Sequence, residues 1–286
     1  MKKILAIALC IIMVMSLVAC AAKPAETPAP EVEAPVADAP AEEITDAAYI
    51  EGNGKLIIGY TVYEPMNYFD ADGNFTGFDT EFAEAICEKL GLAPEFVEIN
   101  WDTKEIELNA KSIDCIWNGM TITEERAANM SISMPYVKNA QVVVVKADST
   151  VASTADLIGA TVVAEMGSAG EAQVQGEDAN ADLAQATYVG MAKQTDCLME
   201  VKAGTADAAV LDWTLAKSMV GEGTDFADLK MVDGLELAAE EYGIAFRQGS
   251  DFTAKVDAAI NELVAAGTLP ALAEKYGRAL APAIAD

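Results

Sequence analysis

The feature that most constrains the fold is a repeated alternation of short apolar, strand-like runs with helix-like segments. Strands are expected at residues 55–59, 96–99 and 113–117, and helices at 79–90 and 101–111. A second alternation follows, with strands at 161–164, 187–189 and 208–211 and helices beginning at 168, 195 and 213. Strands that alternate with helices predict parallel sheets covered by helices, which is an α/β fold.

Two segments predict how the alternations are connected. The apolar run 142–145 would carry the chain from the first alternation into the second, and the run 242–246 would bring it back before two C-terminal helices at 251–266 and 269–276. We therefore expect two Rossmann-like lobes joined by two crossover strands. Lobe 1 would comprise residues 51–141 and 241–286, and lobe 2 residues 142–240, each long enough to bury its own core.

The N-terminus predicts export and anchoring. Lys2 and Lys3 precede a short apolar run, so residues 1–19 are expected to be a secretory signal peptide. Leu17-Val18-Ala19-Cys20 resembles a lipobox, in which cleavage before Cys20 leaves that cysteine to carry lipid. Residues 20–50 are rich in Ala, Pro and Glu and are expected to be a disordered tether. No later segment has the roughly 18 consecutive apolar residues of a membrane span.

Composition excludes several classes of function. The 286-residue chain has a formal net charge of −28 and contains no histidine. Nucleic acid is therefore a poor partner, and catalytic triads that need histidine and His-ligated zinc sites are excluded. Asp70, Asp72 and Asn74 imitate a calcium loop, but Phe75 stands where that loop needs glycine, so we expect a hairpin turn. Neither a metal nor a cofactor is expected.

Cysteine usage leaves one question open. Five cysteines are present, of which Cys87, Cys115 and Cys197 belong to the expected folded region. Buried free thiols are the favoured interpretation, although a disulfide between Cys87 and Cys115 is compatible with their placement in one lobe.

Candidate binding residues follow expected strands, where open α/β sheets hold their ligands. Asn118, Gly119 and Thr121 follow one strand, and Arg126 lies in the first turn of the next helix, where a cation opposes the helix dipole. Arg126 is either a surface cation paired with Glu124 or Glu125, or a receptor for a carboxylate. We expected free backbone N–H groups near Gly119 and Thr121, and the Thr121 hydroxyl, as further donors.

Lobe 2 offers complementary candidates. Gly167 and Ser168 begin a helix, and Asp212 ends an apolar strand. Asp212 is either a helix N-cap or a carboxylate that receives an ammonium group. Trp117 is either a pocket wall or a core residue, because it alternates with Cys115 on one face. An arginine in one lobe and an aspartate in the other would together hold a zwitterion.

Several segments resemble the polar amino-acid solute-binding proteins of ABC importers, which have the type II periplasmic-binding-protein fold. These are GYTVYEPMNYFDADGNFTGFDTEFAEAICEKLG, DCIWNGMTITEERAANMSISMPYV, and YGIAFRQGS with the closing LVAAGTLPALAEKYG, and the similarity runs from about residue 55 to 277. The resemblance implies that Arg126 binds the ligand carboxylate and that Asp212 binds its ammonium. It also implies that Tyr63 stacks on the ligand, that Asn118, Gly119, Thr121, Gly167 and Ser168 add contacts, and that Glu165 lies where specificity is set.

The expected activity is therefore binding and not catalysis: a free amino acid closes the lobes, and the closed form docks on a permease. The protein is expected to be a monomer on the outer face of the cell membrane. Two alternatives stay open. One is a cyclohexadienyl (prephenate or arogenate) dehydratase on the same fold, with Glu165 as the acid or base. The other is a ligand sensor that presents its closed form to a receptor.

Overall fold

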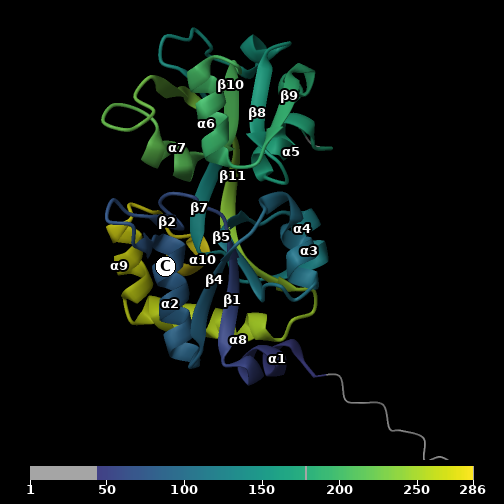
Figure 1. The fold of residues 1–286 in the computed structure, drawn as a ribbon, viewed down its shortest axis with the longest axis vertical. Coiled ribbons are helices and arrows are strands. Elements are labelled where there is room, and N and C mark those ends of the chain that lie inside the picture. Colours follow the sequence, from purple (N-terminus) through teal and green to yellow (C-terminus); the bar gives the residue numbers. More distant parts are fainter. Residues whose placement is uncertain (1–43, 178, 286) are drawn as a thin grey trace, which may run out of the picture. The chain divides into compact units, whose positions relative to one another are not determined.

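The computed structural model describes residues 44–177 and 179–285, so the signal peptide, Cys20 and most of the expected tether lie outside the described residues. One sheet of nine strands organises the chain, in the order β4-β1-β5-β11-β7-β10-β8-β9, and β6 pairs with β11 (Figure 1). The strands are β1 (Lys55–Tyr60), β4 (Ala93–Glu98), β5 (Cys115–Thr121), β6 (Met130–Ile132), β7 (Val137–Lys146), β8 (Thr161–Glu165), β9 (Thr187–Met191), β10 (Ala208–Asp212) and β11 (Leu229–Arg247).

Helices cover both halves of this sheet. The half of the sheet that contains β1, β4 and β5 carries α1 (Asp46–Asn53), α2 (Phe78–Leu90), α3 (Lys104–Asn109), α4 (Glu124–Asn129), α8 (Phe252–Ala265), α9 (Thr268–Lys275) and α10 (Pro282–Ala285) (Figure 1). Those packed with β8, β9 and β10 are α5 (Ala169–Gln175), α6 (Gln194–Ala203) and α7 (Trp213–Met219). Short 3-10 helices are η1 (Trp101–Thr103), η2 (Thr154–Leu157) and η3 (Leu183–Gln185). We call these two sets, with their strands, the first and second lobe.

Strand direction differs between the lobes and their connection. β1 is parallel to β4 and β5, and β8 is parallel to β9 and β10, as the strand–helix alternation predicts. The crossover strands β7 and β11 are antiparallel to each other, and they join β5 on one side to β10 on the other. The α/β class is confirmed. The sheet is mixed because a chain that crosses between lobes and returns must run in both directions.

The returning strand is much longer than the sequence indicated. β11 spans 19 residues, whereas the apolar pattern marked only its last part, 242–246. Residues 233–241 of β11 mix four acidic residues with Gly, Leu and Ala and are partly exposed, so they carry no continuous apolar run. Backbone pairing with β7, as in Glu240 opposite Asn139, holds this segment in the sheet instead.

The hydrophobic core settles two alternatives. Trp117 is fully buried and packs edge-on against Phe82, with ring centroids 5.1 Å apart, so it belongs to the core. Cys87 and Cys115 are buried free thiols, as is Cys197. Burial raises the pKa of Cys87 to about 12, which keeps the thiol protonated and unreactive.

The predicted end of the tether was wrong, and one expected helix begins slightly earlier than predicted. The tether was expected to reach residue 50, but α1 begins at Asp46, is capped by Thr45 and buries Ala47 and Ile50. Its start is fixed by contacts distant in sequence, since Ala47 N–H donates to Asp251 Oδ1 at 2.7 Å. The helix expected at 79–90 is α2, which begins at Phe78 with Gly77 as its N-cap residue. The Asp79 carboxylate is buried beneath β5, where it accepts from Gly119 N–H at 2.6 Å and from the Tyr136 hydroxyl at 3.0 Å.

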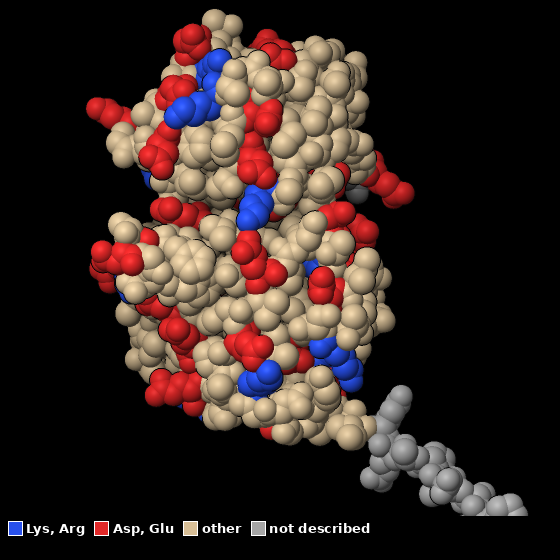
Figure 2. Space-filling model, in the orientation of Figure 1, with Lys and Arg blue, Asp and Glu red and all other residues tan. Residues whose placement is uncertain are grey.

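The surface agrees with the composition. Figure 2 shows acidic side chains spread over both lobes, with basic side chains in a few small groups. The calcium-loop imitation is a hairpin between β2 (Tyr68–Phe69) and β3 (Phe75–Thr76), as predicted. Among the described residues no group of acidic, Cys or His side chains is arranged to hold a metal. No single described helix is long and apolar enough to cross a membrane; α8 and α9 pass that test only when taken together, across a 78° bend.

Candidate functional site

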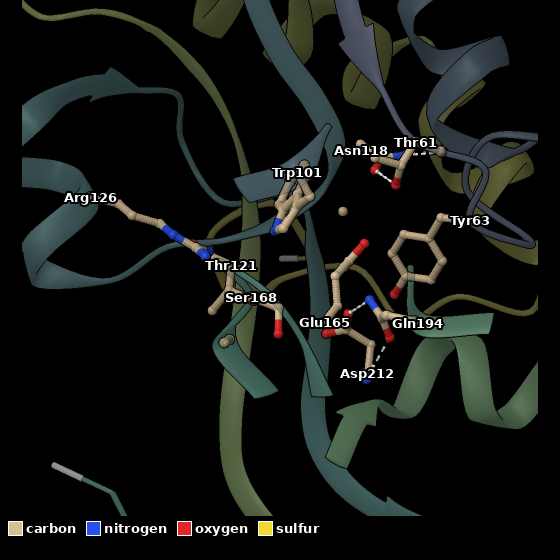
Figure 3. Close-up of a pocket in the computed structure, with 12 residues that line it drawn as sticks. Thr61, Tyr63, Trp101, Asn118, Thr121, Arg126, Glu165, Ser168, Gln194 and Asp212 are labelled. Carbon is tan, nitrogen blue, oxygen red and sulfur yellow. Dashed lines mark hydrogen bonds between the residues drawn. The ribbon is translucent and has the colours of Figure 1, made fainter. Parts of the chain in front are cut away.

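A cavity lies where the carboxyl ends of the parallel strands of both lobes meet, and Figure 3 shows most of its lining residues. The lining residues all follow or end one of these strands. They are Thr61 and Tyr63 after β1, Trp101 after β4, Asn118, Gly119 and Thr121 in β5 with Arg126 after it, Glu165 at the end of β8 with Ser168 and Ala169 after it, Gln194 after β9, and Asp212 at the end of β10. Eight of the nine predicted binding residues therefore line one cavity.

Arg126 is a buried cation with no carboxylate partner among the described residues. Thr123 caps α4 and places Arg126 in its first turn, as predicted. The guanidinium donates to Thr121 O at 2.8 Å and, across the lobes, to Gly167 O at 3.0 Å. The alternative of a solvated surface cation is wrong, because the residue is only 8% exposed. Burial lowers the pKa of Arg126, and the Glu240 and Asp212 carboxylates act in the opposite direction.

The β5 residues before Arg126 form part of the cavity wall, but their hydrogen-bond donors already bond to other groups of the protein. Gly119 N–H is not free, since it donates to Asp79. Gly119 has φ +58°, and a Cβ at this position would lie 2.7 Å from a Tyr63 ring carbon, so the close approach needs glycine. The polar atoms of the Asn118 side chain bond to Thr61 and Asn67 within the first lobe. The Thr121 hydroxyl donates to Glu240 Oε2 at 3.0 Å.

Asp212 is the opposing anion in the second lobe. It is the N-cap residue of α7 by position, but its carboxylate makes no capping bond. Instead it accepts from Asn139 at 2.6 Å, from Gln141 at 2.8 Å, and from the Gln194 amide. Burial raises the pKa of Asp212, and the three amide donors oppose that rise. These donors hold the carboxylate in one orientation without neutralising its charge.

A second acid, Glu240 of β11, lies beside Asp212. Asn139 and Gln141 each donate to Glu240 Oε2 at 3.0 Å as well as to Asp212, so two amides bridge the two carboxylates. Burial raises the pKa of Glu240 to about 7, and the charge of Asp212 contributes. Both amides are on the crossover strand β7, which places this network at the connection between the lobes.

Glu165 ends β8 and is only 4% exposed. Figure 3 shows its carboxylate directed into the cavity, drawn between Trp101 and Tyr63. Burial raises the pKa of Glu165 to about 8; nearby Asp212 adds to the shift, whereas Lys104 and Gln194 reduce it. Lys104 itself donates to Trp101 O at 3.1 Å and to Gly167 O at 2.8 Å.

Gly167 is the predicted residue that the structure leaves off the cavity wall. Its N–H donates to Glu171 Oε2 at 2.7 Å, and its carbonyl accepts from both Arg126 and Lys104. Gly167 therefore joins the lobes. Two polar pairs do the same at the periphery: Lys193 Nζ lies 2.7 Å from Glu98 Oε1, and Ser218 Oγ lies 2.9 Å from Glu64 Oε1.

Sequence reasoning missed Thr61, Trp101, Ala169 and Gln194 on the cavity wall, and Glu240 behind it. A signal existed for Trp101 and Gln194, because each follows the carboxyl end of an expected parallel strand. Trp101 was assigned to a helix, and Gln194 lies just before the helix expected to begin at residue 195, so neither was considered as a site residue. Glu240 had no such signal, since its segment did not read as a strand.

Known proteins are similar to this chain both in sequence and in architecture. Residues 56–279 match the family model of the bacterial extracellular solute-binding proteins, family 3. The chain belongs to this family. Its fold is the type II periplasmic-binding-protein fold that the resemblance implied.

Family 3 relatives differ in the ligand that their names give. The chain is 31% identical to the arginine-binding extracellular protein ArtP of Bacillus subtilis (strain 168), over 79% of this chain and 87% of ArtP. It is 30% identical to the L-cystine-binding protein TcyJ of Escherichia coli (strain K12), over 79% of this chain and 84% of TcyJ. Among solved structures, the P235GK mutant of ArgBP from T. maritima superposes with a TM-score of 0.73 at 34% identity, covering 81% of this chain and 99% of that one.

Proposed function

We propose that the protein binds a free amino acid in the cavity between its lobes and delivers it to the permease of an ABC importer. The observation that carries this proposal is a pair of buried opposite charges, Arg126 from the first lobe and Asp212 from the second, that line the same cavity. A guanidinium suits the α-carboxylate, and a carboxylate suits the α-ammonium. The names of the family 3 relatives agree with an amino acid as ligand.

The two ends of the ligand would be held by different lobes, which couples binding to closure. Arg126 now donates two of its five N–H groups to backbone carbonyls, so donors remain for a carboxylate. Asp212 is oriented by its three amide donors toward the cavity it lines. Because a zwitterion meets both charges only when the lobes are together, it binds the closed state better and shifts the population toward it.

The other residues of the cavity wall complete the site. Tyr63 and Trp101 supply aromatic walls, and the Tyr63 hydroxyl is fixed by a 2.6 Å hydrogen bond to Tyr242. Thr121 and Ser168 add hydroxyl groups to the wall, and Gly119 provides the space that Tyr63 needs. Lipid on Cys20 and the segment that follows it would keep a monomeric binding domain at the outer face of the membrane, within reach of the permease.

Calorimetry on Arg126→Ala tests the proposal. A carboxylate left without its guanidinium is a buried unpaired charge, so affinity should fall by about 3–5 kcal/mol, or at least 100-fold. The ligand is found first by a thermal-shift screen of the common amino acids and cystine, since a ligand that binds only the folded state raises the melting temperature. Lys217→Ala, which removes an exposed cation of the second lobe, is the matched control. Near-unchanged affinity in Arg126→Ala would refute the assignment.

The dehydratase alternative uses the same cavity in a different way. Glu165 is protonated at neutral pH when its pKa is about 8, so a proton donor is present. Incubation of the purified protein with prephenate and with arogenate, followed by assay for an aromatic product, separates the two functions. Binding of amino acids without product formation supports the transport role.

A further inference from the structure

We infer, resting on the proposed function, that the ligand is an amino acid with a positively charged side chain and that Glu165 receives this charge. The names of relatives do not decide the matter, because they include both arginine and cystine as ligands. The decision comes from the bonding and charge of the cavity itself.

Glu165 differs from the two other acids of the site in its hydrogen bonding. Asp212 and Glu240 each accept three side-chain hydrogen bonds. The Glu165 carboxylate is as buried as Asp212, but the only hydrogen-bond donor that acts on it among the described residues is the Gln194 amide, which also donates to Asp212. A buried carboxylate with too few donors is costly. Because this one is directed into the cavity (Figure 3), its missing partner is expected there.

The charges on the cavity wall lead to the same partner. Two carboxylates, Glu165 and Asp212, line the cavity with one cation, Arg126. A zwitterionic backbone engages Arg126 and Asp212 and leaves Glu165 unmatched. Lys104 does not neutralise it, since no ion pair within 4 Å joins the two and its ammonium donates to the Trp101 and Gly167 carbonyls. One further positive charge, on the ligand side chain, would neutralise the remaining negative charge of the cavity wall.

The walls beside Glu165 also suit a cation. Trp101 and Tyr63 line the same cavity as Glu165. Aromatic faces attract cations, and Trp101 already has the Lys104 ammonium 4.9 Å from its ring centroid. A long cationic side chain would bury its methylene groups against these rings and end at the carboxylate.

Protonation of Glu165 provides a measurable consequence. In the free protein its pKa of about 8 reflects burial, Asp212 of β10 and Asp196 of α6, opposed by Lys104 of α3 and the Gln194 amide. Below that pH the free carboxyl holds a proton, and a cationic side chain must displace it. Binding of a cation at pH 6 should therefore release a proton, and affinity should rise toward pH 8 by up to about tenfold per pH unit. A neutral side chain should show neither effect.

The experiment compares ligands that differ by one charge. L-arginine is paired with L-citrulline, and L-lysine with L-norleucine, in calorimetry at pH 6 and pH 8 in buffers of different ionisation enthalpy. We expect a cationic member to bind at least about tenfold more tightly than its neutral partner and to release a proton at pH 6. In Glu165→Gln the ratio of cationic to neutral affinity should fall by about tenfold or more. Glu274→Gln, at an exposed carboxylate, is the matched control.

The outcomes separate this inference from the function on which it rests. Equal or tighter binding of the neutral partners, or an undiminished preference in Glu165→Gln, would overturn the cationic ligand while leaving amino-acid binding intact. The absence of binding by any common amino acid would overturn the proposed function, and this inference with it. A melting temperature of ligand-free Glu165→Gln close to that of the original protein shows that the variant is folded.

Discussion

Two buried arginines, Arg126 and Arg247, have the same exposed fraction of 8% but opposite surroundings. Arg247 pairs with Asp46 at 2.6 Å and with Asp114 at 3.0 Å, and it also donates to the carbonyls of Leu108 and Ile113. Arg126 donates only to carbonyls, those of Thr121 and Gly167. The charge of Arg247 is neutralised by carboxylates of the protein, whereas Arg126 has no counter-ion among the described residues.

The difference appears in the electrostatics. Burial disfavours both charges, but the carboxylates of Asp46 and Asp114 outweigh it and raise the pKa of Arg247. At Arg126, burial dominates and lowers the pKa. A fold gains nothing from a buried cation that lacks a counter-ion, because desolvation exceeds the energy of bonds to neutral carbonyls. Such a cation indicates a ligand with negative charge, whereas Arg247 is explained by the structure alone.

Substitution of Arg247 tests its structural role and should have the largest effect of the predicted substitutions, a loss of stability. Arg247→Ala leaves Asp114, which is fully buried, without its guanidinium and releases Asp46 at the start of α1. We expect the free energy of unfolding to fall by about 3–5 kcal/mol, measured by urea titration. Lys255→Ala, which breaks an exposed pair with Glu51, should cost less than about 1 kcal/mol.

The affinity of the folded fraction of Arg247→Ala should stay within about threefold of the original, because Arg247 does not line the cavity. A variant that kept its stability and lost its ligand would reverse the roles of the two arginines.

A conservative substitution of Arg126 tests how this residue would bind the ligand carboxylate. Arg126→Lys keeps the positive charge but replaces a planar fork of donors with a single ammonium. We expect affinity for the amino acid to fall by about 10- to 100-fold, or about 1.4–2.8 kcal/mol, by calorimetry. If lysine serves as well as arginine, the anion is held by charge alone and the two-point carboxylate contact is wrong.

How well sequence predicts each part of the molecule depends on where its partners lie. Asp212 directly follows an expected apolar strand and Arg126 lies in the helix after another, so both were candidates because the carboxyl ends of parallel strands converge. Their roles in ligand binding came from the resemblance to the family. The nine-stranded sheet was predictable in its parallel parts for the same local reason. Asp46 was assigned to a tether because its partner, Arg247, lies 201 residues away.

Other features had no local signal. Glu240 joins the site through amides of a strand a hundred residues earlier, and its own segment has no continuous apolar run. Gly119 N–H was expected to be free, yet a buried aspartate 40 residues earlier accepts from it. In each case a polar group is satisfied by a distant residue, and sequence spacing does not record such pairing.

The smallest expected effect gives the sharpest contrast between the arginines. Arg126→Met removes the unpaired cation and supplies a flexible apolar side chain of similar length. The lost bonds to the Thr121 and Gly167 carbonyls and the lost attraction of Glu240 and Asp212 destabilise the protein, and relief from burying a charge stabilises it. Because these contributions oppose one another, the free energy of unfolding should change by no more than about 1 kcal/mol in either direction.

Urea unfolding without ligand measures this change, after refolding to remove any bound amino acid, with Arg247→Met as the matched variant. Arg247→Met should be destabilised by about 3 kcal/mol or more, because two carboxylates lose their partner at once. Equal losses in the two variants would mean that Arg126 is as necessary to the fold as Arg247. There would then be no reason to assign the charge of Arg126 to ligand binding. A loss of unfolding free energy that is several-fold larger in Arg247→Met supports a structural role for Arg247 and a ligand-binding role for Arg126.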